Sequence, residues 1–171
     1  MVAARWLVLT WRLPASASST PRVATWRSLQ RLGAVNLTPG SVIVPYSEHL
    51  HEQLDWIAED ITQRGGDAYV LPITELPESD EEAIRRRMKL ARRAEYVRLH
   101  DSAEALAGRL GKTDFATIEP AERLRLEREL GALERGLERV AERDHFSSAE
   151  RSRATRAIRL ARRQAQKEGT R

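Results

Sequence analysis

The arginines near the carboxyl end are the side chains of this sequence best placed to bind an anion. Serine, threonine and alanine residues separate them, so the segment is not a low-complexity run. On a helix, spacings of three and four residues place Arg156, Arg159 and Arg163 on one strip. Such a strip can follow a phosphate backbone and release its counterions, so we predict DNA binding here; a solvated helix face is the alternative. The predicted DNA-binding residues are Arg151, Arg153, Arg156, Arg159, Arg162 and Arg163.

The positive charge of the chain is concentrated in the same segment. The 171 residues contain 29 Lys and Arg against 25 Asp and Glu, a formal net charge of +4. Residues 1–78 carry 6 basic and 8 acidic side chains, and residues 79–150 carry 15 and 16, so both parts are close to neutral. Residues 151–171 carry 8 basic side chains and 1 acidic side chain, a net charge of +7. This asymmetry favours a polyanionic partner.

Arg12 and Arg22 form a second candidate site, for a tetrahedral oxyanion. Arg22 follows Thr20-Pro21, which is typical of a helix start. It therefore lies in the first turn, where free backbone N–H groups favour anions. Arg12 ends a predicted strand nearby, and two guanidinium groups suit a dianion such as sulfate or chromate. The alternative is that Arg22 pairs with a carboxylate or lays its stem along the helix end.

Several kinds of chemistry are excluded by what the sequence lacks. The chain has no cysteine, which excludes disulfides, thiolate metal sites and thiol-based redox or nucleophilic chemistry. Its four histidines do not have the spacing of metal ligands, and there is no glycine-rich phosphate loop. We therefore expect no metal, no cofactor and no enzymatic activity. If Arg12 and Arg22 bind an oxyanion such as chromate, they must do so through charge, because the chain has no thiol to reduce it.

The first part of the chain predicts a small sheet with two helices. Strand-like runs, separated by helices that begin at Thr20 and Ser47, occupy residues 5–11, 35–37, 41–45 and 68–73. The order strand-helix-strand-strand-helix-strand is typical of the ferredoxin-like split βαβ arrangement. Pro72 favours an edge position or an irregular end for the last strand. The apolar face of the first helix is predicted to contain Val23, Trp26, Leu29 and Leu32.

The second part of the chain predicts three helices. Capping boxes at Ser79–Glu82 and Ser147–Glu150 open the first and the third helix, and Pro120 opens the second. The first helix is expected to reach about Leu110. The second carries the spacing of a coiled-coil seam at Leu126, Leu130, Leu133, Leu137 and Val140.

These elements define the predicted fold class and domains. We predict an α+β protein, in which a ferredoxin-like βαββαβ domain at residues 1–78 precedes a three-helix extension at residues 79–171. The extension consists of a helical hairpin and the terminal basic helix.

Several short segments carry a family resemblance. They are Trp6-Leu7-Val8-Leu9, Leu13-Pro14, Arg22, Trp26-Arg27-Ser28-Leu29, Arg31-Leu32-Gly33-Ala34, Ser41-Val42, Pro45, Arg93-Ala94-Glu95-Tyr96 and Asp144-His145-Phe146. Together they resemble the amino-terminal domain family of the chromate-resistance protein ChrB. The resemblance covers nearly the whole chain, and its most specific part is residues 22–34.

The resemblance implies a chromate-responsive transcriptional regulator of a chromate efflux transporter. It therefore adds DNA and chromate, or another oxyanion, as expected partners. Many members of the family carry a further carboxy-terminal domain, whose activity is not transferred to this chain. Domains similar to the first part commonly pair, so we expect a homodimer. The alternative function is a non-catalytic interaction module whose coiled-coil-like seam docks a separately encoded partner domain.

The sequence gives no indication of a membrane segment. No apolar run approaches the roughly 18 residues that a membrane helix needs. Ala15-Ser16-Ala17 imitates a signal-peptidase site, but the apolar patch before it, Trp6–Trp11, is only six residues long. We expect a cytoplasmic protein with no membrane partner.

Overall fold

A computed structural model describes residues 4–14, 19–113 and 117–166 of the chain. The chain divides into two units, Met1–Met88 and Lys89–Arg171. The division falls inside a long helix, α3 (Glu78–Leu110), so the first turns of this helix belong to the first unit. The predicted boundary between residues 78 and 79 lies at the start of the same helix.

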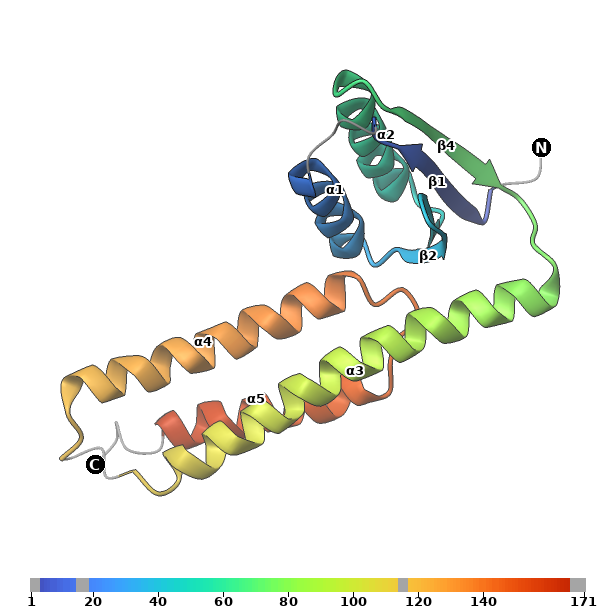
Figure 1. Cartoon of the computed structure of the whole chain (residues 1–171). Helices are drawn as coiled ribbons and strands as arrows, with labels where there is room; N and C mark the ends of the chain where they lie inside the picture. Colours follow the sequence, from blue (N-terminus) through green and yellow to red (C-terminus); the bar gives the residue numbers. More distant parts are fainter. Residues whose placement is uncertain (1–3, 15–18, 114–116, 167–171) are drawn as a thin grey trace. The chain divides into compact units, whose positions relative to one another are not determined.

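The first unit contains a four-stranded antiparallel sheet (Figure 1). Its strands are β1 (Trp6–Arg12), β2 (Val35–Thr38), β3 (Ser41–Pro45) and β4 (Asp67–Ile73), in the spatial order β2-β3-β1-β4. Strand β1 is central, as its apolar run predicts, and the Pro72-containing strand β4 is at an edge. Order and direction are those of the ferredoxin-like arrangement, so the predicted α+β class is confirmed.

Helices α1 (Ser19–Arg31) and α2 (Glu48–Gln63) lie on the same face of this sheet (Figure 1). Helix α2 begins as predicted, because the Ser47 hydroxyl accepts a hydrogen bond from the Leu50 backbone N–H at 3.1 Å. The shared core consists of Leu7, Leu9, Leu29, Ala34, Val42, Val44, Leu50 and Leu54.

One residue that was predicted on the apolar face of α1 is exposed in the structure. Val23 is 44% exposed, whereas Thr25 is buried. The reason is the rotation of α1, which turns the strip through Thr25 and Leu29 toward the sheet. The prediction for Val23 is therefore wrong, and that for Leu29 is confirmed.

The first turns of α3 cover part of the opposite face of the sheet. Ile84 and Met88 are buried, and so is Trp6 on β1. The Arg85 guanidinium lies 5.6 Å from the centre of the Trp6 ring, and Arg87 donates to the Asn36 carbonyl of β2. These contacts hold the start of α3 on the sheet.

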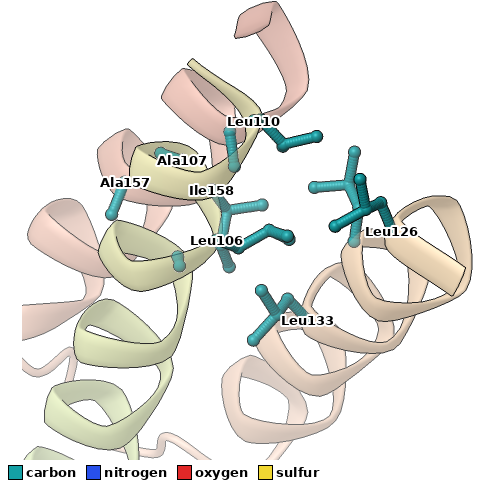
Figure 2. Close-up of a cluster of buried hydrophobic side chains, with 10 residues drawn as sticks. Leu106, Ala107, Leu110, Leu126, Leu133, Ala157 and Ile158 are labelled. Carbon is teal, nitrogen blue, oxygen red and sulfur yellow. The ribbon is translucent and has the colours of Figure 1, made fainter. Parts of the chain in front are cut away.

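The second unit is a three-helix core. The later part of α3 packs with α4 (Pro120–Glu142) and α5 (Glu150–Gln166), and all three contribute buried side chains (Figure 2). The predicted seam of α4 is confirmed, since its five residues are buried or packed against this core. From α5 the core receives mainly alanines and Ile158.

Neither α3 nor α5 begins with the capping box that the sequence predicts. Helix α3 begins at Glu78, and the Pro77 carbonyl accepts from the backbone N–H groups of the following turn. Before α5, Ser147 has a left-handed backbone (φ 51°), so its hydroxyl does not cap the helix. The neighbouring Ser148 hydroxyl pairs with Glu150 instead, at 2.8 Å.

Candidate functional site

Helix α5 has one apolar face and one arginine-rich face. Its buried residues are Ala154, Ala157, Ile158 and Ala161, and their spacing directs this face into the three-helix core. The six predicted DNA-binding arginines are all exposed. The predicted division of this helix into two faces is therefore present. Lys167 and Glu168, which enter the sequence-based charge count, lie outside the described residues.

Arg162 is set apart from the other arginines by an acidic partner. Its Nε donates to Oε1 of Glu134 on α4 at 2.8 Å, and Nη2 donates to Oε2, a bidentate pair. The hydrogen bond to Glu134 raises the pKa of Arg162. Its charge is thus partly compensated within the unit, and the residue helps to join α5 to α4.

Arg156, Arg159 and Arg163 form the strip that the spacing predicts. In the part of the chain that the structure describes, none of these three side chains has an acidic partner. On α4, by contrast, Arg123 pairs with Glu127 on the same surface of the helix, at 3.5 Å. We call Arg156, Arg159 and Arg163 the arginine strip. Arg151 and Arg153, near the start of α5, also have no ion pair with an acidic side chain among the described residues.

Arg12 and Arg22 line one pocket of about 520 Å³ beside the start of α1. Arg22 donates a long hydrogen bond of 3.4 Å to the Pro14 carbonyl. Arg12 pairs with Asp67 at 2.7 Å, because the two residues are register partners on β1 and β4. The structure therefore brings the two predicted residues together, with a carboxylate beside them that leaves one net positive charge.

A polar cluster connects α3 to the segment before α5. Tyr96 is fully buried, and its hydroxyl donates to Oδ2 of Asp144 at 3.1 Å. The Ser148 backbone N–H donates to the same oxygen at 2.9 Å. Burial first, and then the charge of Asp144, raises the pKa of Tyr96 to about 12. Asp144 thus fixes the turn from which α5 begins.

Glu95, one residue before Tyr96, lies between two arginines. Its carboxylate is 3.3 Å from Arg92 on the same helix and 3.1 Å from Arg143 at the end of α4. Burial lowers the pKa of Arg92, with Glu95 acting in the opposite direction. These charges are compensated locally, as partly buried charges must be.

Comparison with known proteins gives the family. A family model described as Protein ChrB, N-terminal, matches residues 22–169 of the chain. The chain belongs to the ChrB N-terminal family. Protein ChrB of Cupriavidus metallidurans is 29% identical over 149 residues, which are 87% of this chain and 43% of that protein. The chain therefore spans less than half the length of this relative. No solved structure matches this chain.

The polar cluster brings together two segments that carry the ChrB resemblance. Tyr96 belongs to one of them and Asp144 to the other, 48 residues away along the chain. Sequence reasoning assigned no role to either residue. The available signal was Glu95, a charged residue at helical spacing between the apolar Ala91 and Leu99. Asp67 was also missed, because its partner Arg12 is evident only from the strand register.

The described helices include none that is both long and apolar enough to cross a membrane.

Proposed function

We propose that this ChrB-family chain is a chromate-responsive transcriptional regulator of chromate resistance that binds DNA through α5. Family membership supports the connection with chromate resistance. The observation that carries DNA binding is the arginine strip, which is exposed and has no acidic partner among the described residues. The proposal assigns the chain no catalytic step.

The arginine strip suits a nucleic-acid backbone for an electrostatic reason. Each guanidinium group that contacts a phosphate releases a condensed counterion, which makes binding favourable at low salt. An arginine already paired with glutamate contributes less, because its carboxylate partner must first be displaced. This distinction separates the strip from Arg162 and from Arg123 on α4.

The experiment replaces the three arginines of the strip, keeps helix α5 in place and measures the affinity for DNA. We expect Arg156→Gln, Arg159→Gln and Arg163→Gln together to weaken binding of a duplex from upstream of the chain's own gene at least tenfold. Deleting α5 is unsuitable, because Ile158 belongs to the core.

The control removes the same charge from α4, by Arg123→Gln, Arg125→Gln and Arg128→Gln. Fluorescence anisotropy gives the affinities, and circular dichroism shows that both variants are folded. Equal affinities of the two variants would contradict the role of the strip.

Docking of a separately encoded partner domain is the second candidate function. The α4 seam is buried within its own unit, so it is not the docking surface. Two apolar side chains on α3, Leu90 and Val97, are 55% and 41% exposed and lie two turns apart. Copurification of a partner without salt-sensitive DNA binding would favour this function.

Homodimer formation is also proposed. Strands β2 and β4 are the edges of the sheet, and such edges can pair with a second copy. Light scattering after size-exclusion chromatography measures the mass. A mass of about 39 kDa, twice the 19.4 kDa of one chain, is expected, and a mass of one chain would contradict the proposal.

A further inference from the structure

A second pocket, of about 260 Å³, lies between α3 and α4 in the second unit. Helix α3 contributes Glu95, Arg98 and Ser102 to its lining, and the end of α4 contributes Arg139 and Arg143. Gly136 of α4 is buried in the same lining. This pocket is distinct from the arginine strip, none of whose residues lines it.

The lining has an excess of positive charge. Three arginines and one glutamate leave two uncompensated positive charges. Glu95 is already engaged with Arg143 at 3.1 Å and with Arg92 at 3.3 Å. Within the described ranges, Arg98 and Arg139 have no acidic partner. Among the lining residues, two positive charges therefore have no negative side chain to balance them.

The helix spacing explains how these groups converge. Arg98 and Ser102 are four residues apart on α3 and share one strip of that helix. Arg143 caps the end of α4, four residues after Arg139, and lines the same pocket. At Gly136 a Cβ atom would lie 2.9 Å from Cδ2 of Leu99, so glycine permits the close approach of the two helices. Polar side chains of both helices thus flank the same short gap.

Local helix electrostatics account for only one of the two unpaired arginines. Arg139 lies in the last turn of α4, where the helix dipole favours a cation. Arg98 lies in the middle of α3, where the dipole gives no such preference. Both side chains are exposed at the pocket, so a small anion can reach them from solvent.

We propose that this pocket binds a tetrahedral dianion of the chromate, sulfate or hydrogen phosphate class. Arg98 and Arg139 are the principal ligands, and the Ser102 hydroxyl is an additional donor. Arg143 stays with Glu95 at the edge of the site. The inference rests on the proposed function only in naming chromate as the physiological dianion.

The position of the pocket connects it to α5. Arg143 immediately precedes Asp144, which holds the Ser148 backbone ahead of α5. A dianion held by Arg98 and Arg139 lies beside the Arg143–Glu95 ion pair, and any shift of Arg143 reaches Asp144 through the backbone. The pocket is therefore positioned to make the orientation of α5 depend on the bound anion.

The first experiment measures anion binding to the full chain by isothermal titration calorimetry. Chromate, sulfate and phosphate are compared at constant ionic strength, which distinguishes the source of the dianion. Arg98→Gln and Arg139→Gln are each expected to weaken binding about tenfold or more, since each removes a charged hydrogen-bond donor.

A control keeps this test specific. Arg128→Gln removes a charge from the exposed surface of α4, outside the pocket. This variant is expected to bind the anions within twofold of the unmodified chain. If Arg98→Gln and Arg139→Gln also stay within twofold, the inference is wrong.

DNA binding by the same variants separates this inference from the proposed function. Unchanged DNA affinity of Arg139→Gln without added anion supports a dedicated anion pocket. A loss of DNA affinity without loss of chromate or sulfate binding would show that Arg139 contacts the DNA backbone, which overturns the inference. If the unmodified chain binds no DNA but its anion binding depends on Arg98 and Arg139, the inference stands and the proposed function fails.

Discussion

At the scale of single residues, Asp144 has the most consequential contacts. It accepts hydrogen bonds from the buried Tyr96 hydroxyl and from the Ser148 backbone, so it joins α3 to the beginning of α5. These partners are far apart in sequence, and local patterns contain no information about such a contact. Sequence reasoning could find the exposed arginines, because charge and spacing are local properties, but not the residues that hold their helix in place.

Removing the Tyr96 hydroxyl tests this connection. Tyr96→Phe is expected to lower the free energy of unfolding by about 1–2 kcal/mol, because a buried hydrogen bond to a carboxylate is lost. Urea denaturation followed by circular dichroism gives the value. The matched control is Tyr69→Phe, because Tyr69 is 62% exposed; we expect a change below about 0.5 kcal/mol. Equal effects of the two substitutions would contradict the role of Tyr96.

The pKa of Tyr96 also predicts the stability at alkaline pH. Its value of about 12 in the folded chain lies above the ordinary value of 10.0, so the folded state holds this proton more tightly than the unfolded state. The stabilising contribution is complete below pH 10 and is lost as the pH rises toward 12. The difference in unfolding free energy between the unmodified chain and Tyr96→Phe should therefore shrink over this range. A difference that is constant with pH would contradict the assignment.

At the scale of elements, hydrophobic periodicity predicts almost every helix and strand. The α4 seam is an example, since each apolar position packs where its spacing places it. Helix ends are less predictable, because Asp144 and the left-handed Ser147 determine how α5 begins. The rotation of α1 was also beyond local patterns: burial of Thr25 instead of Val23 depends on how α1 meets the sheet.

The glycines of α3 and α4 give a prediction at this scale. Gly108 has no atom within 4 Å of the position of an added Cβ, so Gly108→Ala should stabilise the chain by about 0.5–1 kcal/mol through helix propensity. Gly136→Ala gains the same helix propensity, but its new Cβ atom would lie 2.9 Å from Cδ2 of Leu99, so the Leu99 side chain must move. Urea denaturation should show a smaller gain or a loss for Gly136→Ala. A gain equal to that of Gly108→Ala would mean that the helices do not approach closely there.

At the scale of the whole molecule, the distribution of charge is more informative than its sum. A net charge of +4 conceals a terminal segment at +7, and the structure places the arginines of its described part on the exposed face of α5. Most arginines that pair with glutamate do so within or between helices, as Arg162 does with Glu134. The arginine strip and the pair Arg98 and Arg139 are among the arginines that have no acidic partner in the described residues. The surface proposed for a polyanion and the pocket proposed for a small dianion thus consist of different residues of the second unit.

The salt dependence of DNA binding tests the central claim most directly. The logarithm of the association constant is measured against the logarithm of salt concentration for the unmodified chain, the strip variant and the α4 control variant. If the arginine strip contacts three phosphates, the slope for the strip variant should be smaller in magnitude by about 2–3, since each contact contributes about 0.9. The control slope should match that of the unmodified chain. Parallel lines for the unmodified chain and the strip variant would contradict the claim that α5 binds DNA.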